Sequence, residues 1–209
     1  MKYLKSPYFY AWIGATIGSA VLMNVVNLFF LYANKLPAAS LLQLGLLLLN
    51  ALAVGAAIGL CQWLLLCCHF ARAYLWILAT AIGTLLSVFI SKAIFSALFA
   101  LGFAAATTVD ISQWLQYAAG LDAMVVAAQW IFLRGQVPRA WRWILFSAIA
   151  AIAVPFLLKF DGFILPTGQS PVQLLLTVIV WGIFTGAITG IPMVDFIKVC
   201  RQRSLSESL

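Results

Sequence analysis

One acidic side chain is the residue of this sequence best placed to do chemistry within an apolar segment. Asp122 lies near the middle of the apolar stretch 111–133, and Gln129 follows seven residues later, on the same helix face and about 10 Å away. An acid in such surroundings marks a functional site or pairs with a buried partner, because desolvation disfavours its charged form. Two interpretations remain open: a polar site built on Asp122 and Gln129, and a neutral carboxyl group that hydrogen-bonds to a neighbouring helix.

Two glutamines occupy matching positions near one end of their apolar segments. Gln62 and Gln129 are each followed by a tryptophan and three aliphatic or aromatic residues. A glutamine amide can bridge two helices, which contributes roughly 1 kcal/mol. Its oxygen could instead ligate the magnesium of a chlorophyll, since hard cations prefer oxygen donors. We favour helix bridging for both glutamines.

Signatures of catalysis are missing from the sequence. The chain has one histidine, and it contains no nucleophile elbow, zinc-peptidase or phosphate-binding loop motif. The adjacent Cys67 and Cys68, followed by His69, lack the second spaced pair of a zinc site. We therefore expect a protein that is not an enzyme and that binds no metal through these residues.

Composition indicates which class of fold must hold these residues. Hydrophobic residues make up 65% of the 209-residue chain and charged residues 8%, whereas soluble domains carry roughly 25% charged residues. A helix needs about 20 mostly apolar residues to span a bilayer. The expected fold is therefore all-α, an integral membrane bundle with six transmembrane helices. The predicted spans are 8–27, 44–66, 72–91, 111–133, 139–158 and 175–197.

We expect a single membrane domain over residues 1–209, with a short cytoplasmic tail at 198–209 and an interfacial or re-entrant helix at 93–106. Nine lysines and arginines lie on one side of the predicted spans and three on the other. The positive-inside rule then places both termini in the cytoplasm. The net charge of +7 fits contacts with anionic lipids rather than nucleic acid, because the basic residues lie at segment ends.

An internal repeat connects these segments. Residues 62–76 recur as 129–143, with six identical residues at the same spacing. The dipeptide Trp12-Ile13 also recurs, at 76–77 and at 143–144. Three helical hairpins in a pseudo-three-fold arrangement are predicted, at about 8–66, 72–133 and 139–197.

Glycines spaced four residues apart should let helix backbones approach closely, which is a main source of helix association in lipid. The pair Gly55 and Gly59 reappears as Gly186 and Gly190. This alignment matches Asp122 with Gly55 and Gly186, so we expect Asp122 to face the interior. The predicted helix-packing residues are Gly55, Gly59, Gly182, Gly186 and Gly190.

Tryptophans gather at the cytoplasmic ends of the predicted helices. Indole rings are favoured there, between headgroups and lipid tails. Pigment or quinone stacking is the alternative role for such rings. The predicted interfacial aromatic residues are Trp63, Trp76, Trp130 and Trp143.

The motif that begins at Gly55, G-x3-G-x2-Q-W-L-x-L, is followed by Arg72 and Trp76. It resembles the repeated G-x3-G-x2-Q-W-L-x-L-R signature of uncharacterised bacterial polytopic membrane proteins, frequent in oxygenic photosynthetic bacteria. The second copy has Asp122 and Val126 at the glycine positions, and the third has Met193-Val194 in place of Gln-Trp. The resemblance implies a bacterial inner or thylakoid membrane and carries over no activity.

Two function classes fit these patterns. The first is a non-catalytic accessory or assembly subunit that packs against a larger membrane protein complex, with membrane lipids and other membrane subunits as partners. The alternative is a small channel or transporter that uses Asp122. We favour the first, because transport sites usually gather several polar groups near the midplane. The aromatic residues also leave room for bound chlorophyll, carotenoid or lipid, although no cofactor is certain.

Overall fold

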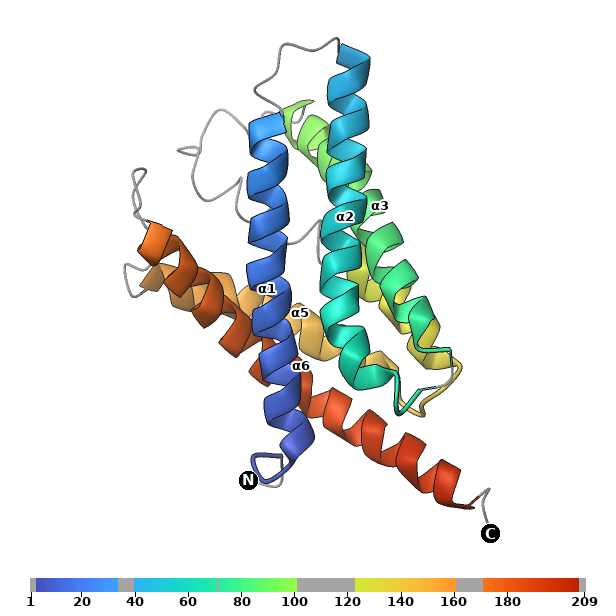
Figure 1. The fold of residues 1–209 in the computed structure, drawn as a ribbon. Helices are drawn as coiled ribbons and strands as arrows, with labels where there is room; N and C mark the ends of the chain where they lie inside the picture. The colour runs from blue at the N-terminus through green and yellow to red at the C-terminus, as the bar shows by residue number, and fades with distance from the viewer. Residues whose placement is uncertain (1–2, 34–39, 71, 101–122, 161–170, 207–209) are drawn as a thin grey trace.

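The computed structural model describes residues 3–33, 40–70, 72–100, 123–160 and 171–206, and within these ranges every regular element is a helix (Figure 1). The all-α prediction is therefore confirmed for the described part of the chain. One helix carries no label in Figure 1 and is named by its residues. The helices are α1 (Pro7–Ala33), α2 (Ser40–Leu66), α3 (Tyr74–Ala100), Ala123–Arg134, α5 (Trp141–Phe160) and α6 (Pro171–Ser206).

Three of these helices are long and apolar enough to cross a membrane. They contain the stretches Pro7–Val26, Leu42–Leu66 and Leu175–Gln202. At 1.5 Å per residue, even the 20 residues of the first stretch cover about 30 Å, the thickness of the hydrocarbon core of a bilayer. The shorter apolar helices are Tyr74–Ile90, Ala123–Arg134 and Trp141–Ala153.

Two helices run beyond the ends that the sequence suggested. α3 continues to Ala100, so residues 93–100 extend this helix instead of starting a separate interfacial element. α6 continues to Ser206, through most of the predicted tail, and Pro192 lies inside it. Neither 91–100 nor 198–206 contains glycine or proline, the residues that most often end helices. Lys92 and Lys198 do not interrupt these helices, because a lone charge does not end a helix.

The outward faces of the helices are apolar. Large hydrophobic side chains recur at helical spacing along the exposed side of α3, and a similar row follows the exposed side of α5. Polar groups would be expected on these faces in water, so the faces suit lipid or another apolar surface. The two rows are Leu78, Ile82, Leu86 and Phe89 on α3, and Ile144, Leu145, Ile149 and Ile152 on α5.

Three helix pairs pack so closely that only glycine fits at the contact: α2 with α3, α6 with α1, and α3 with the helix Ala123–Arg134, where a Cβ atom at Gly83 would lie 2.6 Å from the Cα atom of Val125. A Cβ atom at Gly55 in α2 would lie 2.6 Å from the Cα atom of Ala81 in α3. One turn later, a Cβ atom at Gly59 would lie 2.8 Å from the Cα atom of Ile77. Contact through backbone atoms gives van der Waals attraction without burying long side chains.

The α6–α1 pair repeats this contact with a different pair of glycines. A Cβ atom at Gly182 would lie 2.8 Å from the Cα atom of Ile17, and a Cβ atom at Gly186 would lie 2.9 Å from the Cα atom of Ile13. Ile17 and Ile13 stand 64 residues before Ala81 and Ile77. Gly182 and Gly186 therefore take the places of Gly55 and Gly59. The alignment of Gly55 and Gly59 with Gly186 and Gly190 was wrong by one helical turn.

The turn that joins α2 to α3 has the same backbone geometry as the turn that leads into α5. Arg72 and Arg139, 67 residues apart, both adopt the left-handed conformation, with φ of 56° and 59°. In each turn the same four backbone N–H groups donate to the same three carbonyl groups, for example Phe70 to Leu66 and Val137 to Leu133. A non-glycine residue with positive φ is uncommon. Finding one at the same place in both turns indicates equivalent local structure.

The close α2–α3 contact gives a matched pair of substitutions. Gly55→Ala should destabilise the protein by about 1–3 kcal/mol, because the added methyl group meets backbone atoms that cannot move aside. Gly14→Ala in α1 should stabilise it by up to about 1 kcal/mol, since no atom lies within 4 Å of the added Cβ atom and alanine is the better helix former. Thermal unfolding in detergent measures both changes. Equal stability of the two variants would contradict the close packing.

Candidate functional site

Three tryptophans from three different helices meet at the centre of the bundle. Trp12 of α1, Trp76 of α3 and Trp143 of α5 are 0%, 0% and 3% exposed. Their ring centroids are 5.5–6.3 Å apart, and each pair is nearly perpendicular, at 69–87°. Edge-to-face contacts of this kind contribute about 0.5–1.5 kcal/mol per pair beyond burial. We call these three residues the tryptophan centre.

Two of the three indole N–H groups donate to a neighbouring helix. Trp76 Nε1 donates to Gln62 Oε1 of α2 at 2.8 Å. Trp12 Nε1 donates to Thr189 Oγ1 of α6 at 3.0 Å. Thr189 follows Gly182 by seven residues, as Gln62 follows Gly55. In the register set by the glycine contacts, Thr189 therefore takes the place of Gln62, and not Met193 as the sequence alignment had it.

The third indole differs. Trp143 Nε1 and the hydroxyl group of Ser147, four residues later, are buried without a hydrogen-bond partner among the described residues. The amide that stands at the position equivalent to Gln62 is that of Gln129, and its Nε2 donates to Thr80 Oγ1 at 2.9 Å instead. The indole of Trp143 therefore lacks the hydrogen bond that the indoles of Trp12 and Trp76 make.

The predicted polar pair is only half described. Asp122 lies outside the described residues, so its expected inward orientation stays a prediction. Gln129 is buried and joins the helix Ala123–Arg134 to α3 through Thr80. Gln62 joins α2 to α3, and the oxygen that would ligate a chlorophyll magnesium already accepts the Trp76 indole. The geometry of both glutamines suits helix bridging.

The aromatic residues expected at the lipid interface divide into two groups. Trp76 and Trp143 lie inside the bundle, so their assignment to the headgroup region was wrong. Trp63 and Trp130 are partly buried and pack against the same core, and the guanidinium carbon of Arg134 lies 5.5 Å from the centre of the Trp130 ring. The position of a tryptophan near a helix end does not indicate whether its ring faces the bundle or the surroundings.

The predicted packing glycines all contact a neighbouring helix. Gly55 and Gly59 face α3, while Gly182, Gly186 and Gly190 face α1. A Cβ atom at Gly190 would meet the rings of Phe9 and Trp12, with nearest distances of 3.2 and 3.3 Å.

Sequence reasoning missed an ion pair that ties α5 to α6. Arg142 Nη1 donates to Asp195 Oδ2 at 2.8 Å, and Tyr3 Oη donates to the same oxygen at 3.1 Å. Both charged side chains are about a quarter exposed. No signal in the sequence links Asp195 to Arg142, 53 positions earlier.

Cys67 and Cys68 lie exposed in the turn after α2, with 3.7 Å between their sulfur atoms. The hydrogen bond with Cys68 raises the pKa of the Cys67 thiol, which lowers its reactivity at neutral pH. Among the described residues, no three histidine, cysteine or acidic side chains gather to hold a metal ion. Comparison with known proteins adds no assignment: no protein-family model, curated protein or solved structure matches the chain.

The unequal hydrogen bonding of the tryptophan centre can be measured. Trp76→Phe should destabilise the protein about 1 kcal/mol more than Trp143→Phe, because only the first change leaves a buried glutamine oxygen without its donor. Both variants lose the same ring area, so the difference isolates the hydrogen bond. Thermal unfolding, followed by circular dichroism in detergent, provides the comparison. An equal or larger effect of Trp143→Phe would show that the hydrogen bond to Gln62 adds no net stability.

Proposed function

We propose that this protein is a non-catalytic accessory or assembly subunit that packs against a larger protein complex in a bacterial inner or thylakoid membrane. In this proposal the chain crosses the bilayer six times as three repeated hairpins, with both termini in the cytoplasm. The apolar outward faces of α3 and α5 support a membrane location. The buried side chains of Thr189, Gln62 and Gln129, near the tryptophan centre, join helices through hydrogen bonds. None of these three side chains is titratable, which favours a packing role over acid–base chemistry.

Equivalent positions support the three-hairpin arrangement. The two turns at Arg72 and Arg139 have matching hydrogen bonds and matching φ angles. Each of the three tryptophans reaches the centre from the first helix of its predicted hairpin. The three-fold arrangement also explains why the glycine contact of α2 with α3 recurs between α6 and α1.

A glycine surface on α1, open among the described residues, supports the proposal of a partner subunit. Gly14 and Gly18 of α1 have the spacing of the glycines that hold this bundle together. Gly14 is exposed, no atom lies within 4 Å of an added Cβ atom there, and only Cys61 Sγ lies that close at Gly18. The exposed Tyr10 and Val25 lie on the same side of the helix. A partner helix could approach this surface as closely as α3 approaches α2.

Substitutions at two open glycines test this surface. Gly14→Leu should leave the isolated protein folded, because its side chain enters open space, yet it should prevent close approach by a partner helix. Gly45→Leu in α2 is the matched control, since Gly45 is also exposed with no atom within 4 Å of an added Cβ atom. The measurement is native electrophoresis of membranes solubilised in mild detergent. We expect Gly14→Leu to lose the high-mass complex and Gly45→Leu to keep it.

Two results would contradict the proposal. The first is a wild-type protein that migrates alone in mild detergent. The second is proton or ion flux into liposomes that contain the purified protein and that Asp122→Asn abolishes, while thermal stability is unchanged. That pair of observations would favour the channel or transporter.

A further inference from the structure

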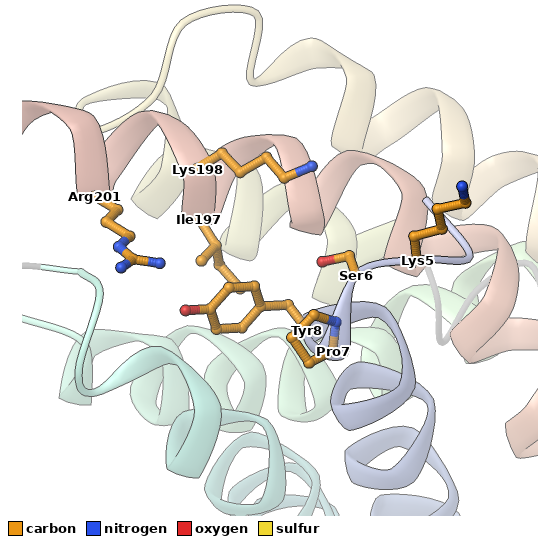
Figure 2. A pocket seen from close by; sticks show the side chains of 7 residues that line it. All are labelled: Lys5, Ser6, Pro7, Tyr8, Ile197, Lys198 and Arg201. Atoms are coloured by element: carbon orange, nitrogen blue, oxygen red, sulfur yellow. The ribbon is translucent and has the colours of Figure 1, made fainter. Parts of the chain in front are cut away.

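A pocket of about 400 Å³ lies between the start of α1 and the end of α6, at the same end of the bundle as the α2–α3 turn (Figures 1 and 2). The apolar part of its wall comes from Pro7, the ring of Tyr8 and Ile197. The contact of Tyr8 with His69, at 5.1 Å between ring centroids, holds this wall against the turn that follows α2. The lining residues are Lys5, Ser6, Pro7, Tyr8, Ile197, Lys198 and Arg201.

The polar part of the wall consists of groups that donate hydrogen bonds or carry positive charge. Lys5, Lys198 and Arg201 contribute three cationic side chains, and no acidic residue is among the seven that line the pocket. Figure 2 shows the Arg201 guanidinium group beside the Tyr8 hydroxyl group at one side, and the Lys198 side chain extending towards Ser6 at the other. Lys5 and Lys198 carry like charges on one wall beside Arg201, so an anion in the pocket would be attracted to this wall.

Ser6 adds a hydroxyl group to the wall of the pocket. The residue is 7% exposed, and Figure 2 shows its hydroxyl group pointing into the pocket. Ser6 also stands immediately before the first residue of α1, where the backbone N–H groups and the helix dipole favour an anion. Proline at the first helical position fits this start.

We propose that this pocket binds a phosphate group, supplied by the headgroup of an anionic phospholipid. Phosphate oxygens would accept hydrogen bonds from Ser6 and the cationic side chains, and the guanidinium of Arg201 can bind phosphate through two parallel bonds. The pocket lies beside two apolar helices, so acyl chains could follow their outer surface. The proposal requires a membrane location and is independent of any partner subunit.

Native mass spectrometry of the whole purified chain tests the site. The probes are detergent micelles doped with phosphatidylglycerol, micelles doped with phosphatidylcholine, and inorganic phosphate without added lipid. We expect phosphatidylglycerol to be retained at one copy per chain and phosphatidylcholine to be retained at least about tenfold less, since each basic residue near an anionic surface contributes about fivefold in affinity. Lys198→Gln with Arg201→Gln should reduce retention of phosphatidylglycerol by about tenfold or more on the same basis.

A control variant that loses the same number of positive charges distinguishes binding in the pocket from non-specific attraction of anionic lipid to the protein surface. Arg134→Gln with Arg139→Gln removes two exposed cations that do not line the pocket, and it should leave retention within about twofold of wild type. Lys5→Gln alone, at an exposed side chain, gives an intermediate loss if the double variant fails to fold. Equal losses in the two double variants, or equal retention of the two lipids, would overturn the proposal. Retention of inorganic phosphate with no preference for either lipid would overturn the lipid assignment.

Discussion

A buried indole N–H group is stabilised when it finds an acceptor, and two of the three central tryptophans find one on a different helix. Trp76 takes an amide oxygen from α2, and Trp12 takes a hydroxyl oxygen from α6. The rings meet edge to face, so a shift of α1, α3 or α5 would change contacts with both others. The positions of α2 and α6 follow, because each must bring one oxygen within hydrogen-bond distance of a fixed indole.

Close backbone contact makes these hydrogen bonds reachable. Gly55 and Gly182 stand seven residues before the two acceptors, Gln62 and Thr189. A larger residue at either glycine would separate the helices by more than the hydrogen bonds can tolerate. In lipid, where burial of apolar surface does not distinguish a neighbouring helix from an acyl chain, such contacts and hydrogen bonds must supply the specificity. The exposed faces of α3 and α5 are accordingly apolar, while Gln62, Thr189 and Gln129 make their hydrogen bonds between helices.

Much of this arrangement follows from sequence patterns. Composition predicted an all-helical chain, and the described part of the chain is all-helical. The glycines singled out for packing lie at contacts between helices. The register of α6 was not predictable, because Gly182, Gly186 and Gly190 follow one another at a spacing of four, so either consecutive pair matches Gly55 and Gly59. The burial of Trp76 and Trp143 was missed for a related reason: sequence places an indole along a helix but does not say which neighbour it will face. The Arg142–Asp195 pair joins residues with no common pattern, so only the fold brings them together.

The central claim is that α6 closes the bundle on α1 one turn away from the register that sequence alignment suggests. Disulfide formation tests it directly, in a variant with the four native cysteines, Cys61, Cys67, Cys68 and Cys200, replaced by alanine. In the structure Gly190 faces the ring of Phe9, whereas the alignment would place it against Ile13. Phe9→Cys with Gly190→Cys should therefore cross-link readily in membranes under mild oxidation, and Ile13→Cys with Gly190→Cys should not. Preferential cross-linking of the Ile13→Cys variant would contradict this account.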